Sequence, residues 1–201
     1  MDLSYKVENL FPSPVHQILI NDFDDYKDQL IKETYQEKDE DPIGRKISNE
    51  GGWQSKSTNI QECKSEVLKK LITDIFSKFD AVSEGTSFII EGWKNINSPG
   101  NYNSRHDHPR SNLSGVLWIK APKDSGNILF ESPHVFNRYQ QLDIYTEEFK
   151  YNTGSYMSYY FTPKEGNILI FSSNLQHEVN ENKSNEDRIS YSFNVTLINE
   201  K

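Results

Sequence analysis

The sequence predicts a mainly β protein with two helices near its N-terminus. Between residues 22 and 80, apolar residues recur at the spacing of an amphipathic helix. From residue 86 to residue 199 the spacing changes to the two-residue period of β-strands, and Gly, Pro, Asn and Asp separate the strands. Several short strands with such punctuation are typical of a β-sandwich or a barrel.

Length and composition predict one domain. The chain has 201 residues, of which 34% are hydrophobic, and its 11 Phe, 11 Tyr and 3 Trp give the core a large buried area. No linker rich in Pro, Gly or Ser divides the sequence. We expect a single domain over residues 1–201, with an N-terminal strand and supporting helices in 1–85 and a β core in 86–201.

The charge balance argues against some classes of partner. The net charge is −8, with 22 basic and 30 acidic residues and no basic stripe, so we expect neither nucleic acid nor an anionic membrane as a partner. No apolar run approaches the ~20 residues that span a bilayer, and the first residues do not read as a secretory signal. The lone Cys63 excludes an internal disulfide and a thiolate zinc cluster. These features predict a soluble, cytoplasmic protein.

The N-terminal part predicts one strand, two helices and an ordered loop. Residues 14–20 form a short strand candidate. The first helix is expected from Asp22, with Asn21 as N-cap, to about Asp39. Residues 43–58 contain paired glycines and no period, which predicts an ordered loop anchored by Trp53. The buried faces of the two helices are expected to contain Phe23, Tyr26, Leu30 and Thr34 in the first, and Cys63, Val67, Leu68, Leu71, Ile72, Ile75, Phe76 and Phe79 in the second.

The second helix, over about 62–79, has the clearest amphipathic pattern and is expected to pack on the outer face of a sheet. The strand candidates that follow are 86–97, 112–120, 126–131, 155–162, 166–171 and 187–198. The polar and aromatic segment 132–154 between two of these strands is either a lid or a variable surface loop.

The last strand alternates completely between apolar and polar residues. Its apolar side has Ile189, Tyr191, Phe193, Val195 and Leu197, and its polar side has Arg188, Ser190, Ser192, Asn194 and Thr196. The polar side either faces water, as in many antiparallel sheets, or lines the inside of a barrel that holds a ligand.

Three of the five histidines form a candidate metal site. His106 and His108 lie two residues apart in RHDHP, so an extended backbone places both imidazoles on one side and Asp107 on the other. His177 follows the apolar strand GNILIF. Three neutral imidazoles suit iron, zinc, copper or nickel, although such a pair also occurs in surface turns. We interpret His16 and His134 as structural or solvated, and Cys63 as a core residue.

Several segments together resemble the 2-oxoglutarate- and iron(II)-dependent oxygenases, within a group related to their prolyl-hydroxylase-like branch. The segment SPGNYNSRHDHP is similar to the stretch that carries the family's first metal ligands, and PKEGNILIFSSNLQHEV to the strand that delivers the distal histidine. LSGVLWIK, GNILFES, SNEGGWQS and SFNVTL add to the resemblance, which covers most of residues 90–198. Eleven residues after His177, Arg188-Ile189-Ser190 matches the family's Arg-x-Ser.

The resemblance implies a double-stranded β-helix, a jelly-roll-like barrel with the N-terminal helices on its outer face. It implies an Fe(II) held by His106, His108 and His177, and 2-oxoglutarate as co-substrate. Arg188 and Ser190 would hold the distal carboxylate, which a guanidinium can bind in a bidentate manner. Tyr102 would hydrogen-bond the co-substrate or form an aromatic wall, and Asn95 and Ser114 are further inward-facing polar candidates. The implied activity is a dioxygenase that hydroxylates a C–H bond and releases succinate and CO₂.

One position departs from the family's usual two histidines and one carboxylate, because His108 stands where the carboxylate is expected. Three interpretations are open. In the first, which we favour, three histidines bind the metal. In the second, the side chain of Asp107 rotates inward and is the third ligand, and in the third, the chain has lost oxygenase activity but has kept the pocket. The alternative functions are a cupin-like three-histidine dioxygenase without 2-oxoglutarate and a non-enzymatic binding module. The sequence leaves open a small-molecule or a protein or peptide substrate, and it does not indicate an oligomeric state.

Overall fold

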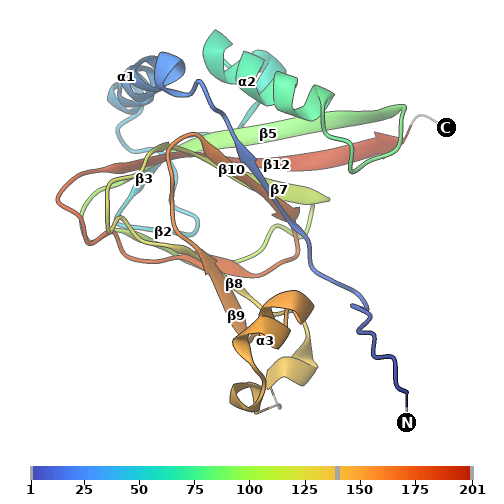
Figure 1. Ribbon diagram of the computed structural model, residues 1–201. Helices are drawn as coiled ribbons and strands as arrows, with labels where there is room; N and C mark the ends of the chain where they lie inside the picture. The colour runs from blue at the N-terminus through green and yellow to red at the C-terminus, as the bar shows by residue number, and fades with distance from the viewer. Residues whose placement is uncertain (1, 139–140, 200–201) are drawn as a thin grey trace.

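The computed structural model describes residues 2–138 and 141–199. Two antiparallel β-sheets face each other, and two helices cover the outer face of the larger one (Figure 1). The predicted mainly β class, with helices on the outside of the sheets, is therefore confirmed.

We call the larger sheet the major sheet and the smaller one the minor sheet. The major sheet contains, in spatial order, β1 (Val15–Leu19), β10 (Asn167–Ser172), β7 (Leu113–Lys120), β12 (Arg188–Asn199), β5 (Thr86–Asn97) and β3 (Trp53–Gln54), and β4 (Thr58–Asn59) also pairs with β5. The minor sheet contains β2 (Asn49–Glu50), β6 (Tyr102–His106), β11 (His177–Val179), β8 (Ile128–Glu131) and β9 (Ser158–Phe161). The predicted strands are found within three residues of their expected ends, whereas β6 and β11 were not predicted.

The helices α1 (Asp24–Glu40) and α2 (Glu66–Ser77) pack on the major sheet through the predicted faces. The cap prediction for α1 is wrong, because the N-cap position is Phe23 and no side chain caps the helix. The second helix starts later than predicted. A 3₁₀ turn, η1 (Ile60–Glu62), precedes it, and the Ser65 hydroxyl accepts the Leu68 N–H at 3.2 Å as its N-cap.

The core has two layers, one on each face of the major sheet. Strands β7 and β10 are buried on both faces because they lie between the helices and the minor sheet. Their alternate residues therefore enter different clusters: Leu117 and Ile170 pack under the helices, and Trp118 and Phe171 pack between the sheets. This double burial explains the nearly continuous apolar runs of both strands.

The expected loop over 43–58 contains the short strands β2 and β3 and reaches β4. A strand of two residues is too short to show an alternation of apolar and polar residues in the sequence. The strands β2, β3 and β4 form because they pair with β5 and β6. Trp53 is buried, and its indole N–H donates to the Asp41 carbonyl at 2.8 Å, which anchors the segment as predicted.

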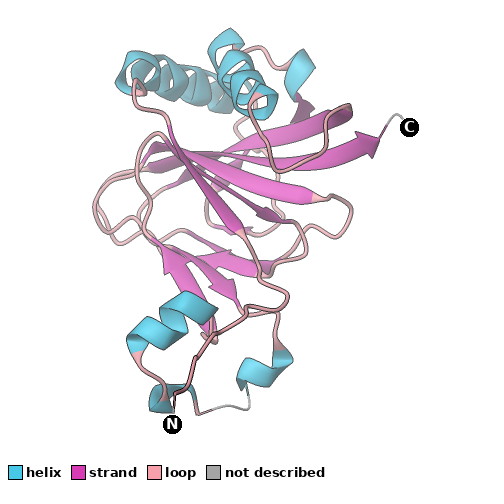
Figure 2. Cartoon of the chain, turned by 45° about the vertical axis from the view of Figure 1, so that its right-hand side comes forward, coloured by secondary structure: helices cyan, strands magenta, loops and turns pink. Residues whose placement is uncertain are grey.

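The expected lid or surface loop over 132–154 contains three short helices: η2 (Val135–Arg138), η3 (Leu142–Ile144) and α3 (Glu147–Thr153). They project from the minor sheet on the side opposite to α1 and α2 (Figure 2). The N-terminal segment runs beside them, and the Asn9 amide donates to the Asn152 carbonyl at 2.8 Å. Within the described ranges, no helix is both long and apolar enough to cross a membrane.

Candidate metal centre and co-substrate cavity

His106 and His177 face each other across two neighbouring strands of the minor sheet. The register pairs His177 of β11 directly with His106 of β6, and their ring centroids lie 4.4 Å apart. On the other side of β11, His177 pairs with Phe130 of β8. The antiparallel backbone therefore fixes the spacing of these two imidazoles.

A shift in strand register places a residue other than the predicted Tyr102 beside the histidines. His106 pairs with His177 and Asn103 pairs with Val179, so three steps along β6 oppose two along β11. An extra residue of this kind is a β-bulge, and it reverses which residues face inward. Asn103 consequently lines the cavity between the sheets, whereas Tyr102 is 44% exposed and does not line it.

His108 reaches the same point from the turn after β6. Its backbone N–H donates to the Ser173 carbonyl at 2.7 Å, which holds this turn against the segment that leads into β11. Its ring centroid lies 5.0 Å from that of His106 and 5.3 Å from that of His177. The potential ligand atoms of the three histidines lie within 4.8 Å of one another, and in the described part of the chain Asp107 does not belong to this group.

Backbone carbonyls orient two of the imidazoles. Nδ1 of His106 lies 2.7 Å from the Ser104 carbonyl oxygen, and Nδ1 of His177 lies 2.9 Å from that of Leu175. A carbonyl oxygen only accepts, so Nδ1 carries the proton in both rings and Nε2 keeps its lone pair. Histidine ligands of metals are typically held in this way.

Burial keeps the three imidazoles neutral. Desolvation, together with the neighbouring His106, lowers the pKa of His177 to about 3 and that of His108 to about 4. Desolvation also lowers the pKa of His106. At neutral pH all three rings are therefore in the form that coordinates a metal ion.

The inner cavity is the space of about 50 Å³ between the sheets that the three histidines border. The buried guanidinium of Arg188, on β12 of the major sheet, lines it. The hydrogen bonds described for Arg188 all leave from Nη1, to the carbonyl oxygens of Ser125, Gly126 and Asn180. Desolvation lowers the pKa of Arg188 to about 10, so it stays protonated at neutral pH.

In the described part of the chain, no counter-ion lies beside the buried Arg188 guanidinium. Among the ion pairs described, none joins it to a carboxylate. A buried charge without a partner is costly, so this position favours an anionic ligand in the inner cavity. The sequence left two orientations open for the polar side of the last strand, and the inward one is found for Arg188, Ser190 and Ser192, which line this cavity.

The other predicted polar residues of the major sheet also line the inner cavity. The Asn95 amide donates from Nδ2 to the Ser192 hydroxyl at 3.1 Å, and its buried Oδ1 has no hydrogen-bond partner among the described residues. The Ser114 hydroxyl donates to Oδ1 of Asn194 at 2.8 Å. Sequence reasoning missed Asn103 and the indole of Trp93, whose ring centroid lies 5.8 Å from that of His108.

The residues present fit both an iron ion and a dianionic co-substrate. Three neutral imidazoles that converge on one point form a donor set for a first-row divalent ion. The buried guanidinium and the unpaired amide oxygen show that the polar groups of the inner cavity are not fully satisfied by the protein itself. This combination is typical of a non-haem iron oxygenase that uses an organic acid as co-substrate.

Comparison with known proteins gives the family. Residues 91–194, just over half of the chain, match the family described as "Putative 2OG-Fe(II) oxygenase", where 2OG denotes 2-oxoglutarate. The chain belongs to this family, and it is an iron- and 2-oxoglutarate-dependent oxygenase. The predicted family, enzyme class and cofactors are thereby confirmed. In the comparison with curated proteins, no sequence matches.

Solved structures support the fold. A prolyl-4-hydroxylase from Pseudomonas putida superposes with a TM-score of 0.64 at 15% identity, covering 92% of each chain. HygX from Streptomyces hygroscopicus, with nickel and 2-oxoglutarate bound, gives 0.59 at 10% identity over 92% of this chain and 83% of HygX. EctD from S. alaskensis, with bound Fe, gives 0.57 at 14% identity over 90% and 73%. The fold is the double-stranded β-helix of these oxygenases, as the resemblance implied.

The remaining histidines lie elsewhere. The ring of His16 packs edge-on against that of Phe79, at 5.0 Å between centroids, on the helix side of the major sheet. His134 lines a different, larger cavity. Cys63 is partly buried against the core under the helices.

Proposed function

We propose that this oxygenase hydroxylates a C–H bond of an organic substrate at an iron ion held by His106, His108 and His177. One atom of O₂ enters the new hydroxyl group and the other enters the succinate that forms as 2-oxoglutarate loses CO₂. The convergence of three neutral imidazoles, two of them oriented by backbone carbonyls, near a buried Arg188 carries this proposal. The prolyl-4-hydroxylase with the same fold supports hydroxylation as the reaction type.

The bound iron and co-substrate supply the activation of O₂, and the protein supplies position and environment. The carbonyls of Ser104 and Leu175 keep Nε2 of His106 and His177 available as ligands. In this proposal Arg188 and Ser190 hold the distal carboxylate of the co-substrate, and Asn95 adds an amide from the neighbouring strand. A guanidinium suits this role because its geometry matches a carboxylate.

Aromatic side chains exclude water around the histidines. The rings of Phe130 and Phe171 lie 5.8 and 4.9 Å from that of His177, and Trp93 lies against His108. A water-poor site strengthens its electrostatic interactions and protects reactive species from side reactions.

An anaerobic spectral titration tests the proposal. Fe(II) is added to the purified apoprotein first, and 2-oxoglutarate second. We expect a visible charge-transfer band that needs both additions and is absent in Arg188→Met. Iron binding without such a band in the unchanged protein would contradict the proposed arrangement, and so would an unchanged band in the Arg188 variant.

A further inference from the structure

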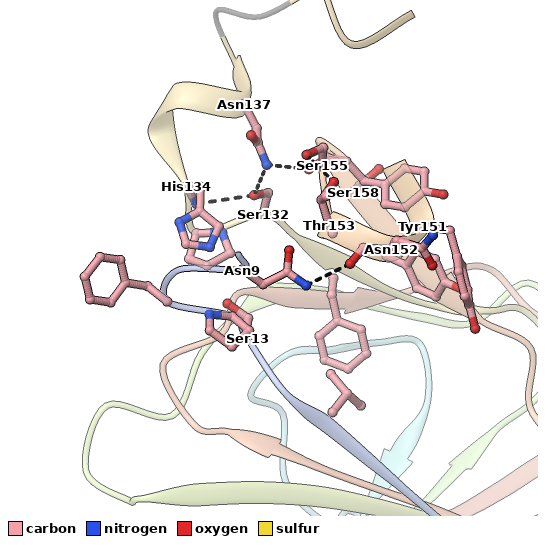
Figure 3. Close-up of a pocket in the computed structure, with 18 of the residues that line it drawn as sticks. Asn9, Ser13, Ser132, His134, Asn137, Tyr151, Asn152, Thr153, Ser155 and Ser158 are labelled. Carbon is pink, nitrogen blue, oxygen red and sulfur yellow. Dashed lines mark hydrogen bonds between the residues drawn. The ribbon is translucent and has the colours of Figure 1, made fainter. Parts of the chain in front are cut away.

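A second cavity lies outside the inner one, between the N-terminal segment and segment 130–161 (Figure 3). We call it the side cavity. Its volume of about 690 Å³ is within the range of pockets that bind organic molecules, roughly 300–1,000 Å³. The inner cavity, at about 50 Å³, is too small for an organic substrate.

The side cavity and the metal centre share a wall. Phe130 and Leu175 both line the side cavity. The ring of Phe130 lies 5.8 Å from that of His177, and the Leu175 carbonyl is the acceptor for Nδ1 of His177. A molecule in the side cavity therefore lies one side chain away from a candidate metal ligand.

Aromatic rings form much of the lining. Phe149, Tyr151, Tyr156, Tyr159 and Phe161 border the side cavity from α3, β9 and the chain between them. Tyr151 and Tyr159 keep 70% and 41% of their surface exposed, so their rings are available to a ligand. Aromatic faces bind flat apolar surfaces.

Beside the His134 imidazole and two carboxylates, the polar part of the lining contains several amides and hydroxyls. Figure 3 shows Asn9 reaching across to Asn152, and the amide of Asn9 donates to that residue's carbonyl at 2.8 Å. On the opposite side, the Asn137 amide donates to the Ser132 hydroxyl at 3.1 Å and to the Tyr156 carbonyl at 3.2 Å. These bonds use Nδ2 of each asparagine, and an amide oxygen accepts from a ligand hydroxyl.

The described part of the lining gives an acidic ligand no Lys or Arg to pair with. Among the lining residues that the structure describes, none is Lys or Arg. The two lining carboxylates already have basic partners, since Glu8 pairs with Lys6 and Glu131 pairs with Arg105. An anionic ligand would lose its hydration here without gaining an ion pair from a described Lys or Arg, whereas an uncharged ligand does not have this cost.

We propose that the side cavity binds the organic substrate of this oxygenase, and that the substrate is an uncharged molecule with a flat apolar ring and several hydroxyl groups, of the chemical type of a neutral aryl glycoside. The role as substrate site rests on the proposed function. The ligand class rests on the aromatic, amide and hydroxyl groups of the lining and on the lack of Lys and Arg among its described residues.

Two probes that differ in charge test the ligand class. Phenyl β-glucoside and phenyl β-glucuronide share the ring and most hydroxyls, but only the second carries a carboxylate. Binding to the full chain is measured by calorimetry or ligand-observed NMR. We expect the glucoside to bind at millimolar concentration and the glucuronide to bind at least about tenfold more weakly. Equal binding, stronger binding of the glucuronide, or no binding of either probe would overturn the proposal.

Two neighbouring tyrosines on β9 provide a matched pair of variants. Tyr159 pairs with Phe130 and lines the side cavity, whereas Tyr160, 60% exposed, points to the other face of the strand and does not line it. Tyr159→Ala is expected to weaken glucoside binding about tenfold, and Tyr160→Ala to leave it unchanged. If Tyr159→Ala does not fold by thermal melting, Tyr151→Ala replaces it. Equal effects of the lining and control variants would place the probe elsewhere.

The failure of this proposal is distinguishable from the failure of the proposed function. Probe binding is measured on the metal-free chain, and the charge-transfer band is measured without probe. A band without probe binding would overturn the side cavity as the substrate site. Probe binding without a band would instead contradict the proposed metal and co-substrate arrangement.

Discussion

His106 and His177 occupy directly opposite positions on adjacent antiparallel strands, with 4.4 Å between their ring centroids. Backbone pairing in the minor sheet sets this separation. The third imidazole, His108, comes from a turn that hydrogen bonds with Ser173 tie to the chain before β11: the His108 N–H donates to the Ser173 carbonyl, and the Ser173 N–H donates to the Asn112 carbonyl. The sheet thus fixes the positions of His106 and His177, and a turn fixes that of His108. Substitutions in this turn test directly which residue completes the metal site.

His108→Ala is expected to abolish retention of Fe(II), because two imidazoles remain where three converge. Asp107→Ala is expected to keep most of the iron, since Asp107 is not in the group of converging ligand atoms in the described chain. Anaerobic metal analysis after gel filtration measures the iron-to-protein ratio. The reverse pattern would show that Asp107 completes the site.

Arg188→Met is expected to weaken 2-oxoglutarate binding by roughly 30- to 5,000-fold, the range for loss of one partner of a buried charge pair. The melting temperature of the apoprotein is expected to be unchanged or higher, because the variant removes a buried, unpaired cation. Calorimetry with the Ni(II)-loaded protein and thermal melting measure the two effects.

Lys94→Met is the matched control for the Arg188 variant. Lys94 is also buried in the major sheet, but it pairs with Glu37 of α1 at 3.0 Å and does not line the inner cavity. Its replacement is expected to leave 2-oxoglutarate affinity unaltered. Similar losses in both variants would mean that Arg188 acts through overall stability.

Metal affinity is expected to change little between pH 7.5 and 6.0. The pKa values of His177 and His108 are lowered to about 3 and about 4, and that of His106 is also lowered, so protons compete with the metal only at lower pH. Three histidines with the ordinary pKa of 6.5 would lose about fiftyfold in affinity over this interval. Calorimetric titration with Ni(II) at both pH values distinguishes the two cases, and a loss near fiftyfold would mean that the rings are not desolvated as described.

Gly115→Ala is expected to lower the free energy of unfolding by about 1–3 kcal/mol, the usual cost of overpacking. An added Cβ on this central strand would come within 2.3 Å of the Phe193 ring and 2.7 Å of the Leu169 carbonyl oxygen. Urea denaturation measures the change, and Lys123→Ala, in an exposed turn, is the control. If the variant and the unchanged protein have the same free energy of unfolding, the Phe193 ring on β12 moves aside at little cost.

Long strands and helices could be predicted from the sequence because each buries a regular face. The alternation in β12 and the runs of β7 and β10 follow from burial on one side or on both. Strands β6 and β11 escaped prediction because their sequences, YNSRH and HEV, are short and polar. Such strands exist only through tertiary pairing.

The chemistry of the candidate site was predictable where residue type decides it, and less so where backbone geometry does. His106, His108, His177 and Arg188 were chosen because imidazoles bind metal ions and a guanidinium binds a carboxylate, and the structure places all four around the inner cavity. Tyr102 was chosen by position, and the bulge in β6 turns Asn103 inward in its place.

The two kinds of ligand-binding group come from different layers of the fold. His106 and His177 belong to the minor sheet, and Arg188 belongs to the major sheet. A dianion that binds the metal at one end and Arg188 at the other therefore links the two sheets non-covalently for as long as it is bound. Its binding free energy adds to the cost of separating them, so amide hydrogen exchange in β6 and β11 becomes slower when the co-substrate is bound.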